Sequence, residues 1–180
     1  MNFRLIPALI LAGVLIQGCG EAVPADGEIE KVRIGNQDFS LRISSSNATR
    51  EQGLGGRTEL ADGEGMLFVF PDAKRRGFWM FGCLMDIDIA FVDPLGHVTA
   101  IHTMPFEPAQ GDEEDILDYE DRLPKYSSGF PAQFAIELAP GMFKELGVRK
   151  GDRLDIDLER MKRIAENSEP TRQASTRSGR

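Results

Sequence analysis

The chain has 180 residues, of which 41% are hydrophobic and 28% charged, as in an ordinary globular protein of one domain. Its formal net charge of −8 argues against general nucleic-acid binding, which needs a surplus of Lys and Arg. Two cysteines exclude a disulfide-rich scaffold and a four-cysteine zinc site.

The first residues predict export. Residues 5–16 are apolar apart from Pro7 and Gly13, a stretch shorter than the roughly 20 apolar residues of a membrane-spanning helix. Such a length is typical of a signal peptide, which we place at 1–18. The tetrapeptide that follows, Ile16-Gln17-Gly18-Cys19, resembles the lipobox of bacterial lipoproteins.

This resemblance implies that Cys19 is lipidated, becomes the mature N-terminus and binds the protein to a membrane, facing the periplasm. Gly20 follows where Asp would favour retention in the inner membrane, so the outer membrane is the favoured destination. The alternative is a simple signal peptide in which Cys19 has no role. Residues 19–28 are small and polar and are expected to form the tether.

Residues 29–158 are predicted to form one β domain. Apolar and polar residues alternate on both sides of Gly35-Asn36, which indicates a hairpin. The continuous apolar run 66–70 predicts a strand buried on both faces. Further strands are expected at 78–80, 87–92, 98–104, 133–138 and 153–158, and short helices at 48–54 and 141–146, each stopped by glycine.

Seven or eight short strands predict an all-β fold, a compact antiparallel β-sandwich or barrel with one or two short helices. From Glu159 the composition becomes polar and mildly basic, and 159–180 is expected to be a disordered tail. Residues 107–121 hold eight acidic residues and no basic one, and are expected to form a solvated loop.

Several stretches together resemble the bacterial and archaeal family catalogued as domain of unknown function 192. They are Thr49-Arg50-Glu51-Gln52-Gly53-Leu54, Gly56-Arg57-Thr58, Gly65-Met66-Leu67-Phe68-Val69-Phe70, Phe78-Trp79-Met80, Asp88-Ile89-Ala90-Phe91, Tyr126-Ser127-Ser128 and Glu137-Leu138 with Gly141. The resemblance covers 29–158 and implies a jelly-roll-like β fold. It implies no activity, because the family has no established general function.

No complete set of nucleophile, base and orienting group is present, so a non-catalytic ligand-binding or accessory module is the preferred function. An envelope glycan or another small molecule is the expected ligand, without a cofactor. Chemical convergence of an aromatic face, an ion pair and two further donors predicts its site. The predicted ligand-binding residues are Arg57, Trp79, Asp88, His102 and Tyr126, with Arg57 as the expected partner of Asp88.

Two other functions stay open. One is a cell-envelope hydrolase of glycan type that uses the carboxylates of Asp86, Asp88 or Glu107. The other is periplasmic copper binding, since soft or borderline ligands occur without a tight spacing at Met80, Cys83, Met85, His102 and Met104. We assign no metal ligand from the sequence. Cys83 is expected to be a small buried side chain rather than a reactive thiol.

Overall fold

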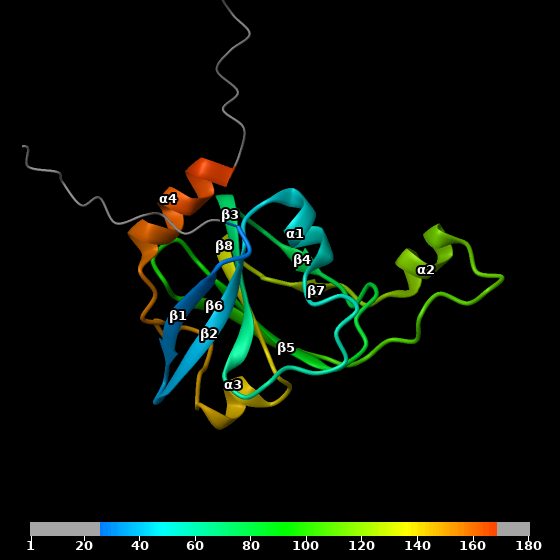
Figure 1. Cartoon of the computed structure of the whole chain (residues 1–180), viewed down its shortest axis with the longest axis horizontal. Helices are drawn as coiled ribbons and strands as arrows, with labels where there is room; N and C mark the ends of the chain where they lie inside the picture. The colour runs from blue at the N-terminus through cyan, green and yellow to red at the C-terminus, as the bar shows by residue number, and fades with distance from the viewer. Residues whose placement is uncertain (1–25, 169–180) are drawn as a thin grey trace, which may run out of the picture.

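The computed structural model describes residues 26–168, so the predicted signal peptide, Cys19 and the end of the predicted tail lie outside the described residues. Eight strands and four short helices make up this part of the chain (Figure 1). The strands are β1 (Ile29–Ile34), β2 (Gln37–Ser44), β3 (Glu64–Lys74), β4 (Gly77–Phe78), β5 (Ile87–Val92), β6 (Val98–Met104), β7 (Tyr126–Ser127) and β8 (Ala132–Leu138). The helices are α1 (Asn47–Gln52), α2 (Ile116–Arg122), α3 (Met142–Glu145) and α4 (Leu158–Ser168).

The all-β prediction is confirmed. Six strands form one sheet in the order β1-β2-β3-β8-β5-β6, and β4 pairs with β7 in a small second sheet. The predicted hairpin joins β1 and β2 through Gly35, whose φ of 60° fits a tight two-residue turn. The run 66–70 is buried throughout, as predicted for a central strand.

The sheet is mixed, which corrects the expectation of a purely antiparallel fold. Strands β2 and β3 pair in parallel. Residues 45–63, which include α1, cross over between them and bring the chain back to the end where β2 began. Parallel pairing needs a long connection of this kind. The two helices expected from glycine stops are α1 and α3.

Two expectations at the C-terminal side are wrong. Residues 153–158 form only isolated bridges, Arg33 with Asp155 and His97 with Arg153. The polar tail begins later than predicted, because α4 extends to Ser168 and packs on the sheet through Met161, Ile164 and Ala165, all buried. At the other end, the Asp26 carboxylate accepts hydrogen bonds from the Ser45 amide (2.7 Å) and the Thr49 hydroxyl (2.8 Å), so residues 26–28 belong to the folded domain.

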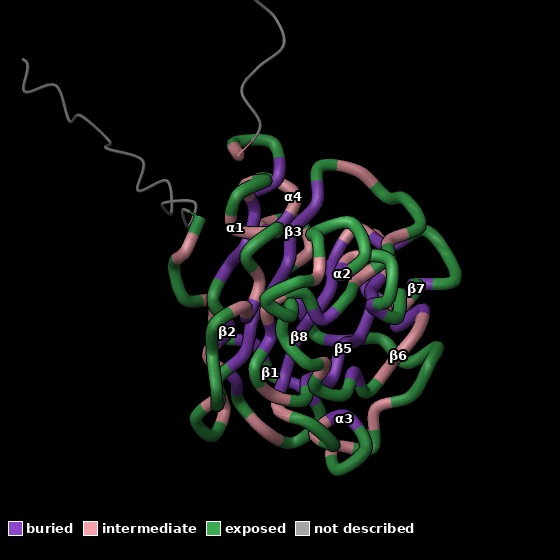
Figure 2. The backbone as a smooth tube through the Cα atoms, turned by 90° about the vertical axis from the view of Figure 1, so that its right-hand side faces the viewer, coloured by how far each residue is buried: buried purple, intermediate pink, exposed green. Residues whose placement is uncertain are grey.

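Alternation along the central strands separates two apolar cores. On one face of the sheet, Leu67, Ala90 and Ile136 pack with residues of α3 and α4. On the other face, Phe68, Ile89 and Ala135 pack with the segment after α1 and with residues 78–83. Figure 2 shows the buried backbone concentrated in the sheet, with exposed connections around it. Within residues 26–168, no helix has the length and apolar character needed to cross a bilayer.

The acidic segment 107–121 is more ordered than expected. It contains α2, which lies on an arm away from the sheet (Figure 1). Asp115 caps this helix by accepting from the amides of residues 117 and 118, and Glu114 pairs with Arg122 at 2.6 Å. Tyr119 is buried, and its hydroxyl accepts a hydrogen bond from the Gly82 amide. The arm is therefore fixed against the segment that follows β4.

Candidate functional site

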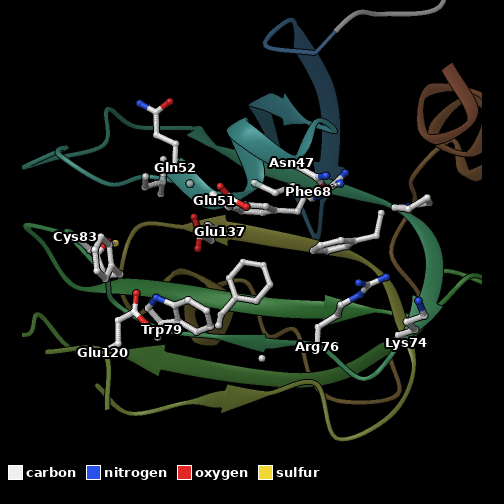
Figure 3. Close-up of a pocket in the computed structure, with 18 of the residues that line it drawn as sticks. Asn47, Glu51, Gln52, Phe68, Lys74, Arg76, Trp79, Cys83, Glu120 and Glu137 are labelled. Carbon is white, nitrogen blue, oxygen red and sulfur yellow. Dashed lines mark hydrogen bonds between the residues drawn. The ribbon is translucent and has the colours of Figure 1, made fainter. Parts of the chain in front are cut away.

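A cavity of about 690 Å³ lies on the face of the sheet that carries the second core. Four parts of the chain, together with one residue of β8, enclose it: α1, β3, the segment 77–83 and the arm that carries α2. Figure 3 shows Glu137 between side chains of α1 and Trp79, with Cys83 toward one end and Arg76 and Lys74 toward the other. Its volume is in the range of sites for small organic molecules.

Aromatic rings form much of the wall. Phe68 and Phe78 meet edge to face, with ring centroids 5.0 Å apart, and Phe70 lies 6.3 Å from Phe78. Trp79 is 44% exposed and borders the cavity, so its ring is accessible to a bound molecule. Trp79 and Phe81 complete the aromatic lining. The cavity therefore offers flat apolar area.

Glu137 is the buried ionisable group of this cavity. In β8, the side chains of Phe134, Ile136 and Leu138 pack in the first core, so Glu137 points to the opposite face. Its cross-strand neighbours are Met66 on β3 and Ile89 on β5, and neither offers a hydrogen bond. The residue is only 4% exposed, and its Oε2 atom has no hydrogen-bond partner.

Burial raises the pKa of Glu137 to about 8, because an apolar environment disfavours the ionised carboxylate. The side chain is therefore mostly a neutral acid at pH 7. Burial, and next the charge of Glu137, raise the pKa of Cys83 to about 12, so this residue stays a thiol. Cys83 is a buried free cysteine, as expected from the sequence.

Positively charged side chains also line the cavity, and each of them is bonded to a neighbouring group. Arg76 donates to the Asp72 carboxylate at 2.6 Å, and its guanidinium lies 4.0 Å from the centroid of Phe70. Lys74 pairs with the same carboxylate at 2.6 Å. Arg50 donates to the backbone carbonyls of Ser45 and, at 3.0 Å, of Val69. These bonds fix Lys74 at the end of β3, Arg76 just after this strand and Arg50 in α1.

The five residues predicted from the sequence are not brought together in this cavity. Trp79 alone among them lines it. His102 and Tyr126 are neighbours, with ring centroids 5.7 Å apart, and the His102 Nε2 atom is 2.8 Å from the Ser127 carbonyl. Tyr126 packs with the second core beside Phe78, on the same face of the sheet as the cavity.

Asp88 and Arg57 are not partners, which corrects the expected ion pair. Arg57 lies 3.5 Å from the Glu64 carboxylate in an exposed pair. Asp88 accepts hydrogen bonds from the Thr103 hydroxyl at 2.7 Å and the Phe143 amide at 3.3 Å. Its neighbours in β5, Ile87 and Ile89, point into the second core, so Asp88 faces the first core, on the opposite side of the sheet from the cavity.

Two of the three carboxylates considered for hydrolysis have structural partners, and the third, Glu107, does not line the cavity. Asp86 accepts a hydrogen bond from the Phe106 amide at 2.7 Å, and Asp88 is bonded as described above. Among the candidate copper ligands, Met80, Cys83 and Met104 pack in the second core. Within the described residues, no group of three or more His, Cys, Asp or Glu side chains is placed to hold a metal ion.

Two solved structures resemble this fold. A protein of Sinorhizobium meliloti 1021 described as a "putative transcription regulator" is 26% identical, with a TM-score of 0.55 over 71% of this chain and 90% of that chain. A protein of unknown function from Novosphingobium aromaticivorans DSM 12444 is 24% identical, with a TM-score of 0.54 over 70% of this chain and 82% of that chain. No curated protein matches the chain.

The sequence of the β domain matches a family model. The model of family DUF192, described as an uncharacterized ACR, matches residues 30–156, which is nearly the whole described domain. The cavity residues from Asn47 to Glu137 all fall inside this match. The chain belongs to the DUF192 family.

Proposed function

We propose that this protein is a membrane-anchored lipoprotein of the cell envelope whose domain binds a small organic ligand in the cavity between α1, β3 and the segment 77–83. The observation that carries the binding proposal is Glu137, a buried carboxyl without a partner at Oε2 in an aromatic cavity. Buried polar groups normally have hydrogen-bond partners. A ligand that supplies the missing partner accounts for this exception.

The envelope location rests on residues 1–19. Labelling cells with radioactive or clickable palmitate is expected to mark the wild type and to leave Cys19→Ala unlabelled, because the lipobox-like sequence ends at this cysteine. Cys83→Ala serves as the matched control and is expected to be labelled like the wild type. Equal labelling of Cys19→Ala and wild type would overturn the anchor.

Ligand binding is tested by thermal unfolding in the presence of envelope sugars, peptidoglycan fragments and small aromatic and aliphatic compounds. A ligand present at 100 times its Kd is expected to stabilise the folded domain by about 2.7 kcal/mol, which raises Tm by several degrees. Trp79→Ala should reduce the shift, because it removes an aromatic wall of the cavity. A screen without any stabilising compound, or a shift unchanged in Trp79→Ala, would contradict this site.

A hydrolase is the second candidate, favoured by one observation. A carboxyl whose pKa is raised by burial suits a general acid, and Glu51 and Glu120 line the same cavity as Glu137. If the protein hydrolyses chromogenic glycosides and this activity disappears in Glu137→Gln, the hydrolase function is favoured over the non-catalytic binding function. The net charge of −8 disfavours DNA binding, which needs a surplus of Lys and Arg to neutralise phosphates.

A further inference from the structure

Glu137 has no counterion of its own in the cavity. Arg76 and Lys74 each form an ion pair with the Asp72 carboxylate, at nitrogen–oxygen distances of 2.6 Å. Arg50 is bound to backbone carbonyls at the end of β2 and in β3. Each positive side chain of the lining is therefore held by another group, and the strands beside Glu137 present only Met66 and Ile89.

The balance of charges leaves room for one more cation. Four carboxyl groups and three cationic side chains line the cavity: Glu51, Asp72, Glu120 and Glu137 against Arg50, Lys74 and Arg76. Lys125, which contacts the Trp79 ring, is not part of the lining and donates to the Glu120 carbonyl. Once Glu137 is ionised, these lining residues have an excess of one negative charge. That charge is buried, where an unpaired carboxylate is most costly and a bound cation interacts most strongly.

The aromatic rings at this site already attract cations. The Lys125 ammonium lies 4.0 Å from the centroid of Trp79, and the Arg76 guanidinium lies 4.0 Å from that of Phe70. Such contacts arise because the negative face of a ring attracts positive charge. Phe68 and Phe78 also line the cavity, and within residues 26–168 neither ring has a cation–π contact. They offer the apolar walls that an organic cation requires.

We propose that the ligand of this cavity is an organic amine whose protonated nitrogen binds Glu137 while its apolar part lies against Phe68, Phe78 and Trp79. This inference rests on the proposed binding function and specifies the chemical class of the ligand. A neutral hydroxyl compound can hydrogen-bond Glu137 but supplies no charge opposite to that of the ionised carboxylate, and an anion is repelled by it. The amine nitrogen donates to Oε2 and supplies that charge.

Binding of an amine must be linked to loss of a proton. At pH 7 the free carboxyl is mostly protonated, and the bound ammonium ion stabilises the carboxylate, so about one proton leaves as the complex forms. Affinity for the amine therefore rises with pH up to about pH 8, by about tenfold per pH unit while the proton is released. A ligand that accepts a hydrogen bond from neutral Glu137 would show the opposite trend.

The test uses three probes that share a phenyl ring on a short chain: 2-phenylethylamine, 2-phenylethanol and 3-phenylpropionate. Trp79 is the single tryptophan of the chain and lines the cavity, so its fluorescence reports binding directly. At pH 7 the amine is expected to bind the wild type about tenfold or more tightly than the alcohol, as for a charged hydrogen bond in a buried site. Its affinity should increase by about tenfold from pH 6 to pH 7.

Two variants test the role of Glu137 among the titratable groups of the lining, which also include Arg50, Glu51, Asp72, Lys74, Arg76, Cys83 and Glu120. In Glu137→Gln, the preference for the amine and its pH dependence should both disappear, while the alcohol binds as before. Glu145→Gln, the same change at an exposed residue of α3 on the opposite face of the sheet, should retain both. Thermal unfolding verifies that each variant is folded.

The outcomes distinguish this inference from the proposed function. If the alcohol or the carboxylate binds as tightly as the amine, the amine is the wrong class of ligand and the binding function stands. If Glu137→Gln retains the preference, Glu137 is not the counterion and the inference is overturned. If none of the three probes binds and no compound of the thermal-unfolding screen stabilises the domain, both the amine inference and the proposed binding function are overturned.

Discussion

Replacement of Glu137 by glutamine is expected to stabilise the domain at alkaline pH. The folded state holds this carboxyl at a pKa of about 8, whereas the ordinary value for a glutamate is 4.5. Between these two values the folded protein binds a proton that the unfolded chain has lost. The free energy of unfolding of the wild type therefore decreases as pH rises through this window and levels off above it.

The glutamine variant lacks this titration, so the difference in stability between variant and wild type should grow with pH. Over roughly three pH units below 8, at 1.36 kcal/mol per unit, the advantage of Glu137→Gln increases by about 4 kcal/mol. Urea unfolding at pH 5, 7 and 9 measures it. The comparison is made as a difference between two proteins, because the other titrating groups are common to both and cancel, apart from Cys83, whose pKa the charge of Glu137 also raises.

Glu51→Gln is the matched control, since Glu51 lines the same cavity but is exposed. Its effect on the free energy of unfolding should stay within about 0.5 kcal/mol at every pH. A difference between Glu137→Gln and the wild type that does not change between pH 5 and pH 9 would contradict the assignment of Glu137 as a buried, partnerless acid. If Glu137→Gln loses amine binding and gains stability, Glu137 serves ligand binding at the expense of stability.

The second large effect is expected at Gly65, in β3 at the centre of the sheet. A Cβ atom at this position would lie 2.4 Å from the Glu137 backbone oxygen, 2.7 Å from a Leu138 methyl and 2.8 Å from a Leu41 methyl. The first of these atoms belongs to the backbone of β8 and cannot move without shifting the strand. Gly65→Ala should therefore cost about 3 kcal/mol of stability, at the upper end for overpacking, because the strand backbone has to shift.

Gly77→Ala provides the comparison. Gly77 also lies in a strand and its φ is not in the left-handed region, but a Cβ atom there meets nothing within 4 Å. This variant should unfold at nearly the same urea concentration as the wild type. Because Gly65 adjoins the backbone of Glu137, a folded Gly65→Ala protein should also show weakened binding in the cavity. Equal stability of the two alanine variants would refute the close approach of β3 and β8.

Local patterns of the sequence predict the strands well and their arrangement less well. The alternation around Gly35-Asn36 and the apolar run 66–70 are contained within a few residues, and both predictions are confirmed. Parallel pairing of β2 with β3 depends on the path of residues 45–63, for which no local pattern exists. Helix α4 was not predicted because the polar composition of the segment was given more weight than the helical spacing of its buried residues Met161, Ile164 and Ala165.

The candidate site illustrates a similar limit. An acidic residue inside an apolar strand must find a partner, and this rule drew attention to Asp88. The same rule applies to Glu137, whose strand is equally apolar. Only the structure distinguishes them, because Asp88 finds its partners in Thr103 and the Phe143 amide, while Oε2 of Glu137 finds none. Trp79, chosen for its aromatic face, does line the cavity.

The position of β8 constrains the order in which the molecule can form. This strand lies between β3 and β5 in the sheet, yet it is the last strand along the described residues 26–168. Until residue 138 is available, β3 and β5 each present an unpaired apolar edge, the feature that promotes association between chains. Nascent protein that stops short of β8 is therefore the species most prone to aggregate, and its productive folding waits on contacts between distant parts of the chain.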